Sequence, residues 1–258
     1  MDLFRCNDTL NYYRLGFNLS ALKPGEVRLE SLPSMEEPDP EDMLRRTFMV
    51  FILRAAERTG IAVQPGLYEH MRGFVSKITD AEEIFNQEEE IKEVLAAGNN
   101  IPLQEVQCRQ NYLLLIDEAP DLGEIPSNVR TLTPDDIPHI QKLVGGGPFY
   151  CPPEPLEAGY VNGWFEGDEL AAVSYTLPAT PNTSKNNGEI LSVFTKEEYR
   201  GKGYMKFCLY KSILAIKKNG KTPMYGCRTT NTPSFKLAQS VGFKLISRTL
   251  RFWRQQNS

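Results

Sequence analysis

The chain has 258 residues, of which 41% are hydrophobic and 24% charged, so it holds enough apolar side chains for one large or two small globular domains. No apolar run approaches the roughly 18 residues that a membrane span needs. The first residues lack the basic-then-apolar layout of a signal peptide, so we expect a cytoplasmic protein without a membrane partner. The five cysteines form no CxxC pair and the two histidines lie far apart, which excludes a typical disulfide framework and a typical metal site.

The charge is divided unevenly along the chain. Residues 1–126 hold 12 Lys+Arg and 23 Asp+Glu, a net charge of −11, whereas residues 127–258 hold 17 and 10, a net charge of +7. A split of this size indicates two regions with different partners, and the basic region would suit an anionic ligand such as a nucleotide. Mutual attraction of the two halves is the alternative explanation. We therefore expect an acidic accessory region over 1–126 and a functional domain over 127–258.

The periodicity of the first half predicts a mainly helical region. Residues 33–42 are rich in Pro, Glu and Asp and predict an exposed linker. The apolar run 112–116 favours a buried strand, and 119–128 reads as a connector with two prolines and a glycine. Apolar residues at helical spacing predict helices over 40–58, 69–78 and 81–97.

The second half predicts alternating strands and helices. It opens with a strand over 129–132 and a helix that begins at Pro134, with Thr133 able to cap it. A turn at Gly167-Asp168 predicts a hairpin between the two strands beside it. In chain order, we expect strands over 161–165 and 170–177, a polar loop over 178–188, a strand over 190–195, a helix over 204–218, a strand over 224–229 and a helix over 232–241. The closing segment 243–253 is expected to be one long strand, or two strands broken near Arg248.

The most informative segment is Arg200-Gly-Lys-Gly203, which follows a predicted strand and opens the predicted helix at Tyr204. A helix N-terminus leaves backbone N–H groups unpaired and carries a partial positive charge, and glycine lets such a backbone approach a ligand closely. Together these features predict an anion site suited to a pyrophosphate. The spacing fits neither GxxxxGK[ST] nor GxGxxG. A basic turn that caps a surface helix is the alternative.

Two motifs in this order resemble the GNAT acetyltransferase superfamily. One is the loop (Arg/Gln)-x-x-Gly-x-(Gly/Ala), present as Arg200-Gly-Lys-Gly203-Tyr-Met205, and the other is Asn231-Thr-Pro-Ser234 followed by Gly242-Phe243. The opening segment 129–136 also resembles the family's first strand and helix. The resemblance covers residues 128–253, roughly half the chain. It implies an α/β (α+β) fold, with a mixed, mostly antiparallel sheet flanked by helices, after the mainly helical N-terminal region.

The resemblance implies acetyl-CoA as co-substrate, and the composition predicts no bound metal. Backbone amides of Val193 and Thr195 would pair with the pantetheine and polarise the acetyl carbonyl. Asn231 and Ser234 would approach the thioester or the pantetheine arm, although capping of a helix by Asn231 or Thr232 is the alternative. The pyrophosphate would be held by backbone groups of the loop, from Arg200, Gly201, Lys202, Gly203, Tyr204 and Met205.

Acetyl transfer to an amine requires a neutral amine, a proton acceptor and a donor for the developing oxyanion. A lysine-like amine has a pKa near ~10, so a general base must take its proton. The backbone N–H of Val193 is the candidate oxyanion donor. Glu189 is the candidate base, because it begins the strand that leads into the loop, where several family members carry a catalytic glutamate. A solvated carboxylate at a strand end is the alternative.

The sequence lacks the residue that usually acts as general acid in this family. The tyrosine that usually follows Asn-x-x-Ser is replaced by Ala238, and Met205 replaces the usual small residue of the loop, which we expect to tighten the loop without abolishing binding. Cys208 falls on an apolar helix face and Cys151 in a loop, so a covalent cysteine route is disfavoured. The remaining candidate acids are three tyrosines: Tyr204, Tyr210 and Tyr225.

The leading hypothesis is an N-acetyltransferase that moves an acetyl group to a primary amine. A small molecule is favoured over a protein as the carrier of that amine. The amine would attack the thioester directly while enzyme, acetyl-CoA and acceptor form a ternary complex. The acidic N-terminal half would attract a cationic amine. The acceptor pocket is expected at the irregular loop and hairpin, with Trp164 better suited to the core. Its candidate residues are Phe149, Tyr150, Tyr160 and Trp164.

Two other functions compete with this hypothesis. A catalytically silent acyl-CoA sensor with the GNAT fold would explain the missing tyrosine at Ala238. A nucleic-acid binder ranks last, because Lys206, Lys211 and Lys217 do not interleave with exposed aromatic residues as a stacking surface would. The sequence leaves the identity of the acceptor and the oligomeric state open.

Overall fold

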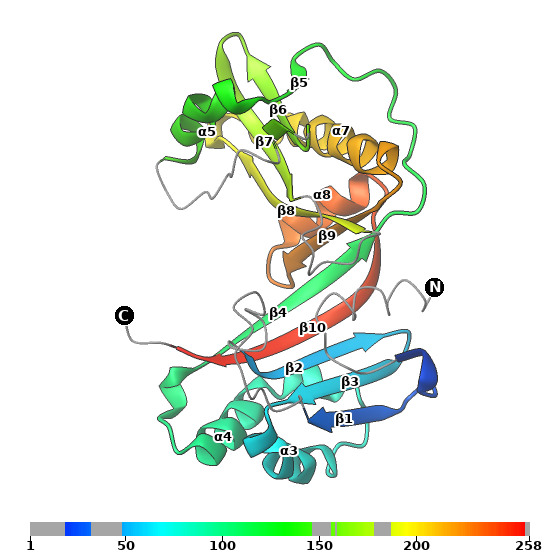
Figure 1. Cartoon of the computed structure of the whole chain (residues 1–258), viewed down its shortest axis with the longest axis vertical. Coiled ribbons are helices and arrows are strands. Elements are labelled where there is room, and N and C mark those ends of the chain that lie inside the picture. The colour runs from blue at the N-terminus through cyan, green and yellow to red at the C-terminus, as the bar shows by residue number, and fades with distance from the viewer. Residues whose placement is uncertain (1–18, 32–47, 146–155, 158, 178–186, 256–258) are drawn as a thin grey trace.

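The structure is a computed structural model that describes residues 19–31, 48–145, 156–157, 159–177 and 187–255, with the backbone only at 177 and 187–192. The described strands form one sheet of ten, in the order β1-β3-β2-β10-β4-β9-β8-β7-β6-β5 (Figure 1). Their bounds are β1 Val27–Ser31, β2 Phe48–Ala55, β3 Arg58–Val63, β4 Val106–Leu115, β5 Val129–Thr131, β6 Val161–Glu166, β7 Glu169–Leu177, β8 Asn187–Thr195, β9 Thr222–Arg228 and β10 Lys244–Arg254.

Helices flank this sheet on both faces. The α-helices are α3 Tyr68–Val75, α4 Glu88–Asn99, α5 Ile137–Val144, α7 Tyr204–Lys218 and α8 Thr232–Ser240. Short 3-10 helices lie at Leu19–Ala21, Pro65–Leu67, Glu83–Asn86, Leu103–Glu105, Pro134–Asp136 and Glu197–Tyr199. Within the described ranges, each helix is too short or too polar to traverse a lipid bilayer.

The strand pairing confirms the predicted fold class. Of the nine neighbouring pairs among the described strands, β1–β3 and β8–β9 are parallel and the other seven are antiparallel. The β6–β7 pair is the hairpin that the turn at Gly167-Asp168 predicts. The molecule is therefore a mixed α/β protein with a mostly antiparallel sheet.

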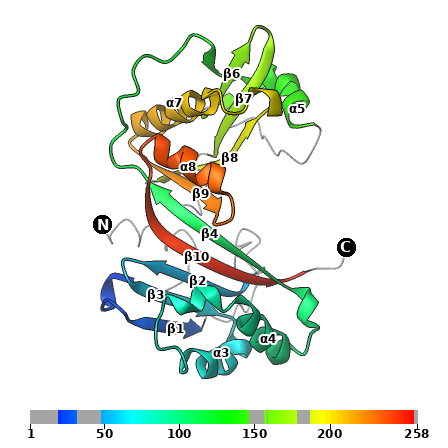
Figure 2. The same cartoon turned by 180° about the vertical axis from the view of Figure 1, so that it is seen from behind.

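In the C-terminal part of the sheet, the helices form two layers (Figure 2). α5 packs on one face, where Ile140 and Leu143 contact Val173 and Tyr175 of β7. α7 and α8 pack on the other face, in a cluster that includes Tyr225 of β9. This arrangement places the start of α7 and the start of α8 on the same side of β8 and β9.

A buried polar chain fixes α7 against the sheet. Ser212 of α7 is fully buried, and its hydroxyl donates to Ser174 Oγ of β7 at 3.1 Å and accepts from Asn162 Nδ2 of β6 at 3.0 Å. Buried polar groups are costly unless they are paired, so these contacts favour one register of the helix on the strands. The start of α7, which carries the predicted ligand loop, is thereby held in place.

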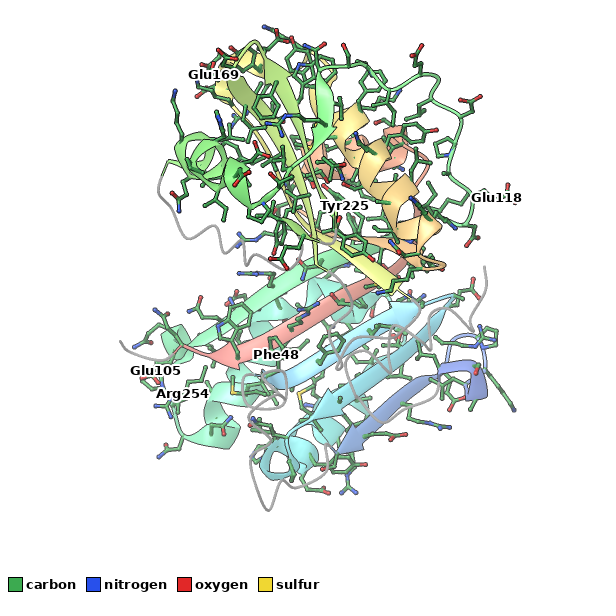
Figure 3. The ribbon with its side chains drawn as sticks, turned by 45° about the horizontal axis from the view of Figure 1, so that its top comes forward. Phe48, Glu105, Glu118, Glu169, Tyr225 and Arg254 are labelled. Carbon is green, nitrogen blue, oxygen red and sulfur yellow. The ribbon has the colours of Figure 1, made fainter. Side chains whose placement is uncertain are left out.

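In the N-terminal part, α3 and α4 cover the face of β2, β3 and β10 that carries Val50, Ile52 and Leu250. Gly98 of α4 has a packing role, because a Cβ atom at this position would lie 2.7 Å from Leu67 Cδ2. Figure 3 labels Glu105 and Arg254, which join the start of β4 to the end of β10 through an ion pair of 2.8 Å.

The helix predicted over 40–58 is wrong where the structure describes it, because Phe48–Ala55 is strand β2. This segment is an almost uninterrupted apolar run that is buried on both faces of the sheet, and such a run satisfies helical spacing as well as strand alternation. The described residues of 1–126 therefore hold four strands beside two α-helices, and the expectation of a mainly helical region is wrong for them.

Other boundaries differ less from the predictions. The helix predicted over 81–97 is divided at Gln87 into a 3-10 helix and α4. The polar loop predicted over 178–188 falls outside the described residues except for 187–188, which begin β8. The closing segment is one strand, β10.

β4 has a larger role than the sequence suggests. It lies between β9 and β10, and pairs with β10 from Val106 to Leu115 and with β9 from Asn111 to Leu115. A strand from the N-terminal half thus lies between two strands of the C-terminal half, and Figure 1 shows β4 and β10 running side by side across the molecule. The division at residue 126 stays a prediction.

Candidate active site

A sharp turn carries the chain from β8 into α7. Gly201 and Gly203 have φ values of 78° and 83°, which lie in the left-handed region that glycine adopts without a steric penalty. A Cβ atom built at either glycine meets nothing within 4 Å. The two glycines are therefore required by backbone conformation, and the space in front of the turn is open.

The start of α7 supplies backbone donors to this space. The N–H of Lys206 donates to the carbonyl oxygen of Gly203 at 3.0 Å, and the N–H groups before it have no acceptor within the helix. α7 is 15 residues long, so its aligned peptide dipoles add partial positive charge at this end. The turn is chemically suited to a phosphate group.

A pocket of about 540 Å³ lies between this turn and α8. It is lined by Val193, Phe194, Thr195, Tyr199, Arg200, Gly201, Gly203, Tyr204, Met205, Lys206, Asn231, Pro233, Ser234, Leu237 and Ser240. Nine of the ten residues predicted to bind the cofactor line this pocket, and Lys202 is the exception. The structure thus brings the two motifs together, and the binding role of each residue stays a prediction.

Contacts with neighbouring side chains hold the turn in position. Glu169 of β7 (labelled in Figure 3) accepts from Lys196 Nζ at 2.6 Å and from Tyr199 OH at 2.9 Å. Lys202 Nζ lies 4.8 Å from the centroid of the Tyr199 ring, and the Tyr204 ring stacks on Trp164 with centroids 4.1 Å apart. Lys202 is therefore directed at an aromatic surface beside the pocket.

β8 and β9 separate as they approach the pocket. Their parallel pairing runs from Asn187↔Thr222 to Ile190↔Tyr225, and β8 continues to Thr195 without β9. The N–H of Lys196 donates to Ala171 of β7, and successive N–H groups along a strand point to opposite edges. The N–H groups of Val193 and Thr195 therefore face the gap on the β9 side.

The start of α8 forms the opposite wall. Asn231 Oδ1 accepts from the backbone N–H of Ser234 at 3.2 Å, so Asn231 caps α8, which is the alternative role considered for it from the sequence. Asn231 also lines the pocket. The Ser234 hydroxyl lies 2.7 Å from the Tyr225 hydroxyl on β9. A buried tyrosine thus reaches the pocket through a serine that lines it.

Burial governs the protonation of the Tyr225–Ser234 pair. Tyr225, labelled in Figure 3, is 2% exposed, and burial raises its pKa to about 12. At neutral pH the phenol therefore keeps its proton and can donate it to Ser234 Oγ. Burial also raises the pKa of the neighbouring Cys227 thiol, against the opposing effect of its hydrogen bond with Ser234.

The other candidate acids and nucleophiles lie elsewhere. The Tyr204 hydroxyl forms a hydrogen bond with Glu166 at the end of β6, and this bond raises the pKa of Tyr204. The hydroxyl therefore points to the hairpin of β6 and β7. Tyr210 is buried on α7. Cys208 is fully buried, and burial raises its pKa to about 12, so it is a core residue as expected, whereas Cys151 falls outside the described residues.

The predicted base can be placed by its backbone. Glu189 lies on β8 opposite Leu177 of β7 and Met224 of β9, one residue before the end of the β8–β9 pairing. Its side chain falls outside the described part of the chain. The catalytic role of Glu189 therefore stays a prediction.

The acceptor residues are divided between the described and undescribed parts of the chain. Phe149 and Tyr150 fall outside the described residues. Tyr160 is buried in the cluster beneath α7 and α8, and Trp164 is buried beside Met205 and Cys208, which supports its expected place in the core.

The sequence interpretation missed a second pocket, of about 340 Å³, which is lined in part by Thr229 and Thr230 of the connection between β9 and α8. Arg109 and Arg228 are part of its lining. They are far apart in sequence and meet only because β4 pairs with β9, so no local pattern could have revealed them.

A comparison with protein families identifies the C-terminal region. The family described as GNAT acetyltransferase matches residues 177–250, a span that contains the glycine turn, α7, β9 and α8. No curated protein matches the sequence.

A comparison with solved structures finds proteins that this chain is similar to, of which three are described. A putative GNAT-family acetyltransferase from Novosphingobium aromaticivorans has 19% identity and a TM-score of 0.49, covering 59% of this chain and 69% of its own. A GNAT-family acetyltransferase from Colwellia psychrerythraea has 14% identity and a TM-score of 0.47, covering 58% and 57%.

The third is a GCN5-related N-acetyltransferase-like protein from Streptococcus suis, with 20% identity, a TM-score of 0.44 and coverage of 58% of this chain and 63% of its own. This chain thus spans less than two thirds of the last two structures. The family match, located on the turn and helices that form the pocket, places the C-terminal region of this chain in the GNAT superfamily.

Proposed function

We propose that the chain is an acetyl-CoA-dependent N-acetyltransferase that transfers an acetyl group to the primary amine of a small molecule. The observation that carries this proposal is the separation of β8 and β9 beyond Ile190↔Tyr225, directly beside a pocket at the start of α7. GNAT membership supports acyl transfer in general. We further propose that residues 1–126 act as an accessory region, which includes β4.

The pocket fits the chemistry of acetyl-CoA. The glycine turn offers backbone donors and open space for a pyrophosphate. The edge of β8 offers the N–H groups of Val193 and Thr195 to the amide groups of a pantetheine arm. The volume of about 540 Å³ lies within the range of roughly 300–1,000 Å³ that is usual for ligand pockets.

Acetyl-CoA supplies a thioester carbonyl and a thiolate leaving group. The N–H of Val193 would donate to the carbonyl oxygen as negative charge develops there. Glu189 would accept the proton of the attacking amine, directly or through water. The amine nitrogen then forms the new bond to the carbonyl carbon while the carbon–sulfur bond breaks.

Ser234 would stabilise the departing thiolate. Since the pKa of Tyr225 is raised to about 12, Tyr225 stays neutral and can donate to Ser234 Oγ over 2.7 Å. With Tyr225 as the donor, the serine hydroxyl would keep its own proton available for a hydrogen bond to the departing sulfur. Ser234 is thus the contacting group and Tyr225 a positioning residue, in the absence of a tyrosine at Ala238.

A catalytically silent acyl-CoA sensor is the second candidate. The observation in its favour is Ala238, a fully buried alanine at the position where the family usually carries a tyrosine. A sensor would bind the same ligand through the same turn. It would differ from an enzyme in lacking transfer to any amine.

The test measures release of free CoA from acetyl-CoA over a panel of primary amines, with mass spectrometry of the acetylated product. We expect amine-dependent CoA release with a matching acetylated product. Saturable acetyl-CoA binding without any product would overturn the enzyme and favour the sensor. Failure to bind acetyl-CoA would overturn both.

A further inference from the structure

The second pocket, of about 340 Å³, lies along the edge of β4 beyond the point where its pairing with β9 ends. β9 pairs with β4 from Asn111 to Leu115, and the N–H of Thr229 still donates to the Gln110 carbonyl oxygen at 3.2 Å. The segment Gln107–Arg109 then keeps β10 on one side and lines this pocket on the other. The pocket is lined by Glu88, Gln107, Cys108, Arg109, Gln110, Arg228, Thr229, Thr230 and Trp253.

Arg109 and Arg228 project from the same face of the sheet. Asn111 pairs with Arg228, and Arg109 lies two residues from Asn111 along β4, a spacing that places side chains on one face. Arg251 of β10 is directly opposite Arg109. Burial and then the neighbouring charges of Arg228 and Arg251 lower the pKa of Arg109, which indicates that these cations lie close enough to repel one another.

No acidic side chain among the described residues forms an ion pair with Arg109 or Arg228. The carboxylate of Glu88, in the same pocket, accepts instead from Gln110 Nε2 and from Cys108 Sγ. Arg109 and Arg228 thus bring two like charges into one pocket. An anionic ligand would relieve this repulsion, and guanidinium groups bind carboxylates with paired hydrogen bonds.

This pocket is a direct neighbour of the proposed active site. Thr229 and Thr230 line it, whereas Asn231 and Ser234, next along the chain, line the pocket at the glycine turn. Arg228 lies three residues beyond Tyr225, where β8 and β9 part, a span of roughly 10 Å along a strand. Because three residues separate them, Arg228 projects from the face opposite to Tyr225, and Tyr225 packs with α7 and α8.

We propose that Arg228 and Arg109 bind a carboxylate of the acceptor, so that the acceptor is an amine that also carries a carboxylate, as amino acids do. This inference rests on the proposed acetyltransferase function and names its substrate class. The amine would lie in the gap between β8 and β9 while the carboxylate pairs with the guanidinium groups. This proposal differs from the expectation drawn from the acidity of residues 1–126: the acceptor would be a zwitterion and not a simple cationic amine.

The experiment compares acceptors that differ only by carboxylate against carboxamide, such as glycine with glycinamide and β-alanine with β-alaninamide. Wild type is compared with Arg228→Gln, with Arg228→Lys, and with the matched control Arg72→Gln on α3, where the side chain is 66% exposed. We expect Arg228→Gln to raise KM for the carboxylates by about 10- to 100-fold, as for loss of a charged hydrogen bond, and Arg228→Lys to lie between. KM for the amides and for acetyl-CoA should stay unchanged, as should every value in the control.

A binding measurement without catalysis completes the test. Calorimetry with N-acetylglycine, its carboxamide and inorganic phosphate should show binding of the carboxylate only, lost in Arg228→Gln. Equal use of acids and amides, or an equal effect of Arg228→Gln on both, would overturn the inference while leaving the acetyltransferase intact. Preferential binding of phosphate would also overturn it. Absence of turnover with all amines would overturn the proposed function, and calorimetry would still decide whether the arginines select a carboxylate.

Discussion

The two ends of the sheet differ in how far their strands stay paired. Toward the N-terminal end, β2 pairs with β3 from Val50 to Ala55 and with β10 on its other side. Toward the C-terminal end, β8 and β9 pair over four positions, Asn187–Ile190 with Thr222–Tyr225, and then separate. Both ends carry two helices on one face, α3 with α4 and α7 with α8.

The difference shows what creates a binding site in this fold. Where the ladder is continuous, strand neighbours take up the backbone donors and acceptors, which favours stability. Where it stops, the N–H groups of Val193 and Thr195 face a pocket instead, beside the start of α7. Backbone groups need partners, so a ligand that provides acceptors at this point is favoured.

The largest effect is expected from removing β4, the strand that joins the N-terminal part of the sheet to the C-terminal part. A protein of residues 127–258 lacks β4 and leaves β9 and β10 without the strand between them. We expect no cooperative thermal unfolding and no near-ultraviolet circular dichroism, because one edge of β9, both edges of β10 and an apolar surface become exposed.

The matched control is the full chain cut in the connector near Gly123 after folding, which keeps β4 in place. We expect this nicked protein to melt cooperatively. A fragment of residues 127–258 that folds cooperatively and binds acetyl-CoA would contradict the structural role of β4.

A second change separates stability from binding. Leu95 of α4 is fully buried in the N-terminal cluster, and Leu95→Ala should lower the free energy of unfolding by about 2–5 kcal/mol. The acetyl-CoA Kd should not change, because the glycine turn is formed by other elements. Urea unfolding and calorimetry measure the two quantities.

Leu214→Ala on α7 is the control for this change, because Leu214 is 37% exposed and should cost within about 0.5 kcal/mol. A large loss of acetyl-CoA affinity in Leu95→Ala would mean that the two ends of the sheet are coupled.

The Tyr225–Ser234 contact provides a catalytic test at the open end. Ser234→Ala should lower kcat by roughly 10- to 100-fold, since a hydrogen bond to a charged group is worth about 1.5–3 kcal/mol, with little change in KM for acetyl-CoA. Tyr225→Phe should have a smaller effect on kcat, because it removes the orienting contact and keeps the serine. Steady-state rates of CoA release measure both.

Ser240→Ala is the matched control, because Ser240 lines the same pocket but its hydroxyl donates to the Leu237 carbonyl at 2.7 Å. An equal loss of kcat in Ser240→Ala and Ser234→Ala would rule out a specific role for Ser234.

The smallest expected effect is on stability and concerns Asp136, which directly precedes α5 on the face of the sheet opposite α7 and α8. Hydrogen bonds from Arg130, opposed by burial and aided by the backbone N–H of Thr133, lower the pKa of Asp136 below its usual 3.8. Because the folded-state pKa is the lower one, this contribution is present at neutral pH and is lost as the pH falls below about 4. Asp136→Asn should cost about 1 kcal/mol at pH 7 and flatten the acid limb of the stability curve, as measured by urea unfolding at several pH values. An unchanged acid limb would contradict the assignment.

Local sequence signals predicted the part of the site that local structure determines. The bounds of α7 agree at both ends, Tyr204 and Lys218, because the preceding glycines and the amphipathic pattern define them. The hairpin of β6 and β7 follows from its turn in the same way. The motif at Asn231 correctly placed the start of α8.

The remaining features depend on contacts between distant segments. The run Phe48–Ala55 has no polar face from which to read its period, so its strand form follows from its place between β3 and β10. The pairing of β4 with β9 brings Arg109 beside Arg228, and the packing of α8 on β9 brings Ser234 to Tyr225. These partners are selected by tertiary packing, which periodicity in one segment does not encode.

The most direct test of the central claim is calorimetric titration of acetyl-CoA into wild type, Gly203→Ala and Gly203→Glu. Both variants bear the strain of a side chain at φ 83°, about 1–2 kcal/mol of stability, but the glutamate also brings negative charge to the open space before α7. The account predicts saturable binding to wild type, weaker but measurable binding to Gly203→Ala, and none to a folded Gly203→Glu. Binding of acetyl-CoA to Gly203→Glu as tightly as to wild type would contradict the placement of the cofactor at this turn.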